Sequence, residues 1–181
     1  MAPATDMPQL VIDAEHFTRV VSQGILQAKL SIDIATADFK AMLVPDGGGR
    51  RAVSIVRVLE KLARRGVEIR LLHAGTPSSA ALVDLKRALP EKLTIRRCPR
   101  LHAKAVIIDC AWMYLGSANL TGAGLGAKGQ GRRNFEWGIC TTWPALIDGV
   151  LEQFNALWEG HRCTDCRRKD ICPVPLEEPE L

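Results

Sequence analysis

Apolar residues recur along this chain with two periods, which predict strands and helices in alternation. Short apolar runs rich in β-branched residues predict strands at residues 30–35, 67–73, 93–98, 103–109, 112–115 and 135–142. Apolar residues three and four positions apart predict amphipathic helices at residues 13–29, 50–65, 80–89 and 144–160. The alternation predicts an α/β fold, a layered sandwich in which helices flank a mixed β-sheet.

Residues that start or stop helices stand at several of the expected boundaries. Asp13 occupies an N-cap position for the first helix, Gly66 is placed to end the second, and Pro144 to open the last. The glycines at 47–49 precede a helix, but they lack the spacing of a phosphate-binding loop. We therefore interpret residues 45–49 as a plain loop.

Length and composition bound the class of protein without choosing a function. The chain has 181 residues, of which 47% are hydrophobic and 24% are charged, as in a soluble globular domain. No apolar run approaches the roughly 18 residues that a membrane span requires. Residues 1–9 also lack a basic stretch followed by an apolar one. We expect a cytoplasmic protein that has no membrane partner.

Polar residues of catalytic type flank the two strands that meet near residues 110–111. His102 and Lys104 are two positions apart, so their side chains point to the same side of an extended chain. Antiparallel pairing about a turn at residues 110–111 sets Lys104 near Ser117 and His102 near Asn119. The pattern therefore predicts that an imidazole, an ammonium group and two hydrogen-bond donors meet at one point.

Asp109 belongs to the same pattern but lies at the opposite end of its strand. It is about 23 Å from His102 along an extended chain, so we interpret it as a turn or capping residue. The whole pattern, H-x-K-x4-D-x6-G-S-x-N over residues 102–119, resembles the signature of the phospholipase D superfamily. The resemblance implies a phospholipase D-like fold, a phosphodiesterase activity, and a downstream glutamate that supports the histidine, here Glu136.

The resemblance also implies a two-histidine mechanism that needs no cofactor for the chemical step. His102 of one subunit attacks phosphorus and forms a phosphohistidine, and a second His102 protonates the leaving oxygen and then activates water. Lys104, Ser117 and Asn119 bind the non-bridging oxygens, and Glu136 fixes the histidine tautomer. Because the motif occurs once, we expect a homodimer with the site on its two-fold axis; a partner protein with a second motif is the alternative.

Basic residues cluster around the motif, although the net charge is only +4. Arg100 precedes His102, and Arg132 and Arg133 end a glycine-rich segment, residues 121–133, that is either a mobile lid or a long hairpin loop. We predict that these three arginines bind substrate and that the substrate is a polyanion. A further basic cluster follows the last helix: Arg162, Arg167, Arg168 and Lys169.

Three functions fit these features. A nuclease acting on DNA or RNA is favoured, because clustered cations suit a phosphate backbone. A phospholipid phosphodiesterase or phosphatidyl transferase is the second hypothesis, because the superfamily includes both. The third is a nucleic-acid-binding subunit of a DNA repair or defence complex that lacks catalysis.

Three cysteines near the end of the chain are spaced like metal ligands. Cys163, Cys166 and Cys172 form C-x2-C-x5-C, and no secretory context favours disulfides. The last helix is expected to return the chain to the active-site end of the sheet, where Cys98 also lies. Cys98 is therefore the expected fourth ligand, and His161 is the second choice.

The cysteine arrangement resembles the iron–sulfur site of RecB-type nucleases, and a four-thiolate zinc site would use the same residues. In either case we expect a structural role, pinning the end of the chain against the active-site rim. The sequence thus predicts a catalytic domain at residues 1–162 and a cysteine-rich extension at residues 163–181.

Overall fold

The computed structural model describes residues 7–45, 52–85 and 89–177. The glycines at 47–49 and residues 178–181 of the predicted extension lie outside these ranges, as do residues 86–88 of the helix predicted at 80–89.

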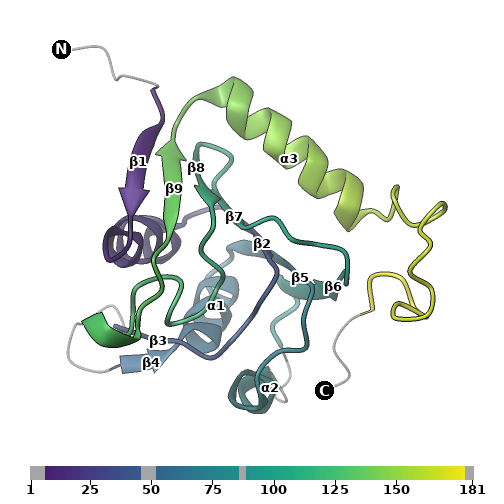
Figure 1. Cartoon of the computed structure of the whole chain (residues 1–181), viewed down its shortest axis with the longest axis horizontal. Coiled ribbons are helices and arrows are strands. Elements are labelled where there is room, and N and C mark those ends of the chain that lie inside the picture. The colour runs from purple at the N-terminus through teal and green to yellow at the C-terminus, as the bar shows by residue number, and fades with distance from the viewer. Residues whose placement is uncertain (1–6, 46–51, 86–88, 178–181) are drawn as a thin grey trace.

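Seven strands form one mixed sheet in the order β1-β9-β8-β7-β2-β5-β6 (Figure 1). The pairs β2–β5 and β5–β6 are parallel, and the pairs β2–β7, β7–β8, β8–β9 and β9–β1 are antiparallel. The strands are β1 (Gln9–Ile12), β2 (Ser31–Thr36), β5 (Glu68–His73), β6 (Leu93–Arg97), β7 (Ala105–Ile108), β8 (Trp112–Gly116) and β9 (Trp137–Thr141). The predicted α/β sandwich with a mixed sheet is confirmed.

Helices pack on both faces of this sheet, with α1 and α3 on opposite sides (Figure 1). The regular helices are α1 (Ile55–Arg64), α2 (Ser79–Leu85) and α3 (Pro144–Trp158). Shorter helical turns are η1 (Phe17–Ser22), η2 (Ile25–Gln27) and η3 (Gln130–Arg132). Two further strands, β3 (Leu43–Pro45) and β4 (Ala52–Ser54), form a separate small sheet that the sequence pattern did not predict.

Strand β7 shows why a central strand can be apolar throughout. Val106 and Ile108 are buried in the core that includes α1 and η1, whereas Ala105 and Ile107 are buried on the side of α3. Successive side chains of a strand point to opposite faces, so a strand that is covered on both faces has no polar side. β7 accordingly has no polar residue, and Lys104 and Asp109 lie directly beyond its two ends.

The helix predicted at residues 13–29 is wrong in extent. The segment forms only the short turns η1 and η2, and Asp13 has a φ of 45° rather than the extended conformation of an N-cap. Its carboxylate accepts the backbone N–H of Glu136 at 2.9 Å instead of a helix N–H. Asp13 thereby joins the segment after β1 to the start of β9.

The second helix begins at Ile55, later than the predicted residue 50. Residues 52–54 pair with β3 instead, and the Ser54 hydroxyl caps α1 by accepting the N–H of Val56 at 3.3 Å. Gly66 has a φ of 104° just after the helix, which confirms its predicted role as the stop.

Candidate active site

The five predicted catalytic residues lie at one edge of the sheet. The parallel strands β2, β5 and β6 all end at this edge. The antiparallel pairings bring the start of β7, the end of β8 and the start of β9 to the same edge. Lys104, Ser117 and Glu136 lie directly next to these strand ends, and His102 and Asn119 lie three residues from them.

The loop between β7 and β8 begins one residue earlier than predicted and contains three residues rather than two, because Ile108 pairs with Trp112. The N–H of Ala111 donates to the carbonyl of Ile108 at 3.0 Å, which places Asp109 and Cys110 in the two central positions. Their φ angles are 54° and 52°, the left-handed values of the turn type that matches the twist of paired strands. The sequence pattern placed the turn at residues 110–111.

This shift changes the pairing of the motif by one position. The carbonyl of Lys104 accepts the N–H of Gly116 at 3.1 Å, so Lys104 lies opposite Gly116 rather than opposite Ser117 as predicted. The error arises from the turn, because a hairpin register is fixed by the turn geometry. Lys104 and Ser117 still share the active-site edge.

Gly116 is required by a buried tyrosine. A Cβ at residue 116 would lie 2.4 Å from the hydroxyl of Tyr114 and 2.6 Å from the Cα of Gly138. The Tyr114 hydroxyl is held there because it accepts the N–H of Ala118 at 3.0 Å and lies 3.0 Å from His16 Nε2. The motif glycine therefore makes room for the side chain that fixes the start of the loop after β8.

Asp109 acts as the turn and capping residue that its position predicted. Its carboxylate accepts the backbone N–H groups of Lys29, Leu30 and Ser31 at 3.1, 2.7 and 2.9 Å. These contacts join the far turn of the β7–β8 hairpin to the entry of β2. Asp109 stabilises the sheet far from the catalytic edge.

His102 and Lys104 differ in exposure although they point the same way. His102 is exposed, whereas Lys104 is buried, with a relative solvent exposure of only 8%. Lys104 Nζ donates to the carbonyl oxygen of His102 at 2.7 Å and lies 3.1 Å from His102 Nδ1. The ammonium group is therefore fixed beside an imidazole that is open to a ligand.

Burial lowers the pKa of Lys104 below its usual value, because a buried ammonium group loses its hydration. The carboxylates of Glu136 and, to a smaller degree, Asp38 oppose this effect and raise the pKa. Glu136 and Asp38 thus favour the charged form of Lys104 at the site.

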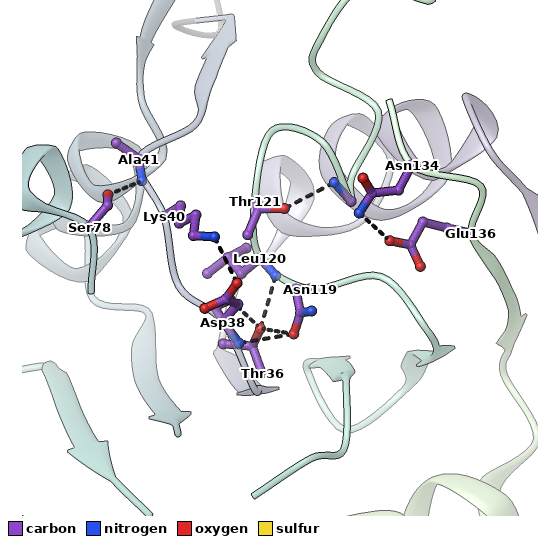
Figure 2. Close-up of polar contacts among 11 residues, drawn as sticks. Thr36, Asp38, Lys40, Ala41, Ser78, Asn119, Leu120, Thr121, Asn134 and Glu136 are labelled. Atoms are coloured by element: carbon purple, nitrogen blue, oxygen red, sulfur yellow. Dashed lines mark hydrogen bonds and ion pairs between the residues drawn. The ribbon is translucent and has the colours of Figure 1, made fainter. Parts of the chain in front are cut away.

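Glu136 is buried and contacts Ser117. The Ser117 hydroxyl donates to the Glu136 carboxylate and accepts the backbone N–H of Trp137 at 3.0 Å. Asn134 Nδ2 donates to the other carboxylate oxygen at 3.0 Å (Figure 2). Within the part of the chain that the structure describes, the Glu136 carboxylate is thus hydrogen-bonded to Ser117 and Asn134, and not to His102.

Asn119 is oriented by residues at the end of β2, as Figure 2 shows. Its Oδ1 accepts the backbone N–H of Asp38 at 3.0 Å and lies 3.3 Å from the Thr36 hydroxyl. The same hydroxyl accepts the N–H of Leu120 at 2.9 Å and donates to the Asp38 carbonyl at 2.7 Å. Because Oδ1 is engaged, the amide nitrogen of Asn119 is the end left to donate to a ligand.

A cavity of about 530 Å³ adjoins His102. Leu157 and His161 line it, which confirms that α3 returns the chain to the active-site edge as predicted. Its basic lining residues are Arg97, Arg100, Arg162, Arg168 and Lys169, and its cysteines are Cys98, Cys163, Cys166 and Cys172. The described residues contain no group of three or more His, Cys, Asp or Glu side chains already arranged to hold a metal ion.

Arg132 and Arg133 lie apart from the residues that line this cavity. Arg132 is exposed in η3, and Arg133 Nε donates to the carbonyl of Lys128 at 2.8 Å within the same loop. The loop joins the site at Asn134, whose N–H donates to the carbonyl of Ala123 at 3.1 Å. Of the three predicted substrate-binding arginines, Arg100 alone is a lining residue of this cavity.

Residues 21–158 match the family model described as the cardiolipin synthase, phospholipase D-like domain. The chain belongs to the phospholipase D superfamily. The β7–β8 hairpin with its single motif thus belongs to a phospholipase D-like domain. Membership of this superfamily supports a phosphodiesterase activity.

Solved structures show the same fold. Nuc from Salmonella typhimurium, a phospholipase D family member, is 21% identical with a TM-score of 0.62 over 84% of this chain and 95% of its own. NucT from Helicobacter pylori is 16% identical with a TM-score of 0.63 over 84% and 96%. TrmBL2, an archaeal chromatin protein whose structure shows DNA binding, is 19% identical with a TM-score of 0.53 over 84% and 52%.

Two comparisons gave negative findings. A search of curated protein sequences found no significant match. Among the helices in the described residues, none has both the length and the apolar character needed to cross a bilayer.

The sequence analysis missed Thr36, Asp38 and Asn134, which orient Asn119 and Glu136. One signal was available for the first two. Thr36 and Asp38 directly follow a buried apolar strand, and polar residues at the carboxyl ends of parallel strands often line sites. Asn134 carries no such signal, because its contact with Glu136 depends on the path of the loop before β9.

Proposed function

We propose that this phospholipase D-like domain is a nuclease that cleaves phosphodiester bonds of nucleic acid through a phosphohistidine intermediate, as a homodimer. The observation that carries the proposal is the exposed His102 imidazole held beside the Lys104 ammonium group, 3.1 Å from Nζ to Nδ1. An accessible imidazole can attack phosphorus, and a fixed cation next to it can bind the non-bridging oxygens as they gain charge.

The chemistry is divided among the residues of the edge. His102 attacks phosphorus and forms a P–N bond as the P–O bond to the leaving group breaks, and the partner's His102 donates a proton to the leaving oxygen. The partner's His102 then removes a proton from water, which attacks phosphorus and releases the first imidazole. Lys104 and the Asn119 amide nitrogen stabilise the phosphoryl oxygens.

The contacts of Ser117 and Glu136 suggest a supporting role for this pair. Ser117 donates to Glu136, and Glu136 favours the charged form of Lys104. In the free subunit, Ser117 thus holds Glu136, and Glu136 favours the charged form of Lys104. Closure of the dimer with substrate would allow Glu136 to accept an imidazole N–H, which is its proposed role toward histidine.

An apolar surface next to the edge supports the homodimer. Ile12 pairs with Trp137 across β1 and β9, and both are exposed because α3 packs over β7 and β8 instead. Phe135, on the other side of Glu136, is 91% exposed. Exposed aromatic residues that flank a buried site residue are typical of an interface. A second copy of this chain would cover them and supply the second histidine.

The basic cavity supports nucleic acid as the substrate. Arg100, Arg168 and Lys169 line the same cavity as His102, and several cations near the reacting group suit a continuous phosphate backbone. A lipid headgroup with one phosphodiester would contact fewer of these cations than a nucleic-acid backbone does.

The direct test uses labelled single- and double-stranded DNA and RNA, with and without chelator, beside His102→Asn. We expect cleavage that persists in chelator and that falls with rising salt, because binding releases counterions. His102→Asn should abolish cleavage, and His161→Asn, a change at another exposed histidine of the same cavity, should retain it. Cleavage by His102→Asn would overturn the mechanism.

Two further measurements separate the alternatives. Phospholipid vesicles replace nucleic acid in a parallel assay, and turnover there without nucleic-acid cleavage would favour a lipid phosphodiesterase. Binding of nucleic acid without turnover of either substrate would favour a non-catalytic subunit. For the dimer, sedimentation of Phe135→Glu/Trp137→Glu should show a monomer that has lost cleavage, whereas Leu43→Glu, at another exposed apolar residue, should stay dimeric.

A further inference from the structure

Four cysteines that are far apart in the sequence meet at one cavity. Cys98 follows β6, and Cys163, Cys166 and Cys172 follow α3, yet all four line the cavity beside His102. Each of them is a free, partly buried thiol. We propose that these four cysteines bind a thiophilic metal centre, a zinc ion or an iron–sulfur cluster, that fastens the segment after α3 to the loop that carries His102.

The segment after α3 already places two of these thiols in a tight turn. The N–H of Cys166 donates to the carbonyl of Cys163 at 3.1 Å, and the N–H of Cys163 donates to the carbonyl of Gly160 at 2.9 Å. Gly160 has a φ of 78°, a value that a side chain rarely adopts, and a Cβ there would lie 3.7 Å from Cys163 Sγ. The chain therefore reverses directly after α3. The thiols of Cys163 and Cys166 are three residues apart, a spacing that allows both to bind one metal ion.

Cys98 is held independently by the sheet. Its N–H donates to the carbonyl of His73 at 2.8 Å, and its own carbonyl accepts the N–H of Leu101 at 2.9 Å. The first contact ties Cys98 to β5, and the second shapes the short loop that leads to His102. A metal ligand at residue 98 would therefore be rigidly connected to the active-site edge.

The end of α3 is fixed to β6, the strand that Cys98 directly follows. Arg96 Nη1 donates to the carbonyl of Trp158 at 3.0 Å, and its guanidinium group lies 4.7 Å from the centre of the indole ring. The segment that follows is held again at its far side, where the N–H of Arg97 donates to the carbonyl of Glu177 at 3.0 Å. The segment that carries Cys163, Cys166 and Cys172 is thus held to β6 at both of its ends.

The charges of the cavity suit a thiolate cluster. Arg100 Nη1 lies 3.6 Å from Cys166 Sγ, and Arg162, Arg168 and Lys169 are further cations of the lining. A divalent metal with four thiolates carries two excess negative charges, and nearby cations stabilise such a charge.

The thiols converge on the cavity without being in ligand positions before a metal binds. Metal binding and local folding are coupled in many small thiolate sites. Cys98 is held by its hydrogen bonds to the sheet and its loop, so we expect the segment after α3 to adjust when a metal binds. A bound metal would fix the segment after α3 in place. Arg168 and Lys169 would then be held beside His102 as basic residues of the cavity lining.

The proposal does not depend on the nuclease activity, and its test has readouts that need no substrate. Full-length protein is purified without oxygen, and its metal content and visible absorption are measured. We expect one zinc ion per chain without colour, or iron and sulfide with the charge-transfer bands of a cluster. Metal-free protein should take up Co²⁺ with the absorption of a tetrahedral thiolate site.

Single changes to serine test the ligand set. Cys98→Ser, Cys163→Ser, Cys166→Ser and Cys172→Ser should each lose most of the bound metal and expose residues 163–177 to protease, whereas Cys110→Ser, at an exposed cysteine in the far turn, should change neither. Circular dichroism checks that each variant is folded. Full metal retention in Cys98→Ser would overturn the assignment of the fourth ligand. Wild-type protein without metal, or with these cysteines in disulfides, would overturn the centre itself.

Discussion

The Ser117 hydroxyl donates a hydrogen bond to the Glu136 carboxylate, which joins the end of β8 to the start of β9 at the catalytic edge. The carboxylate is buried, and it favours the charged form of Lys104 on the neighbouring strand. Glu136, at the start of β9, therefore contacts a residue at the end of β8 and affects the charge of a residue at the start of β7.

The first prediction concerns the charge of Lys104. Burial lowers its pKa and Glu136 raises it, so Glu136→Gln should lower the pKa of Lys104 further, and Lys104 should lose its proton at a lower pH than in the wild type. NMR titration of lysine labelled at Nζ measures this directly. Asp38→Asn should shift the pKa in the same direction by a smaller amount, and an upward shift in either variant would contradict the electrostatic account.

The second prediction concerns the packing around Tyr114. Gly116→Ala places a methyl group 2.4 Å from the Tyr114 hydroxyl, and overpacking of this kind costs about 1–3 kcal/mol or more of unfolding free energy. Urea denaturation measures the loss. Gly149→Ala is the matched control, because nothing lies within 4 Å of its Cβ in α3. It should stabilise the protein by about 1 kcal/mol through helix propensity.

The third prediction separates the motif aspartate from catalysis. Asp109→Ala removes the acceptor of three N–H groups and leaves alanine in a left-handed conformation, so it should lower the unfolding free energy by about 2–3 kcal/mol. Asp109→Asn should cost less, because asparagine tolerates the conformation and retains one acceptor. Turnover per folded molecule should remain at the wild-type value in both variants, and a loss of turnover in folded Asp109→Asn would place Asp109 in the chemistry.

The fourth prediction concerns His73, a buried histidine at the end of β5. Burial lowers its pKa below 6.5, so at mildly acidic pH the unfolded chain binds a proton that the folded protein does not. The stability that the neutral ring provides is therefore complete above about pH 6.5 and is lost as the pH falls below that value. His73→Asn keeps a donor for the Gly75 carbonyl, which His73 Nδ1 contacts at 2.8 Å, but does not titrate.

Urea denaturation at about pH 7.5 and about pH 5.5 tests this linkage. The wild type should lose more stability between the two values than His73→Asn does, because the other titrating groups are common to both proteins. Equal losses would show that His73 is protonated alike in the folded and unfolded chains.

Several features of the site could be predicted from the sequence because they depend on short stretches of chain. The apolar periods located the main strands and the final helix, and the two-residue spacing of His102 and Lys104 placed them on one side of a strand. Asp109 was correctly separated from the catalytic edge by its distance along the same strand. Each of these inferences uses only the fixed geometry of an extended chain or a helix.

Other features were decided by contacts between distant residues. The left-handed conformation of Asp109 and Cys110 shifted the hairpin register by one position, and local composition did not indicate it. Asp13 looked like a helix cap but accepts an N–H 123 positions away, and Thr36 contacts Asn119 across 83 positions.

The sequence by itself determined the superfamily motif, the class of fold and the edge of the sheet that holds the chemistry. Only the tertiary structure decided which partner each polar group has at that edge: Ser117 for Glu136, Asp38 for Asn119, and the shared cavity for Cys98 and Cys166. The physical reason is that secondary structure follows from neighbouring residues, whereas the partner of a buried polar group is set by how whole strands and loops pack together.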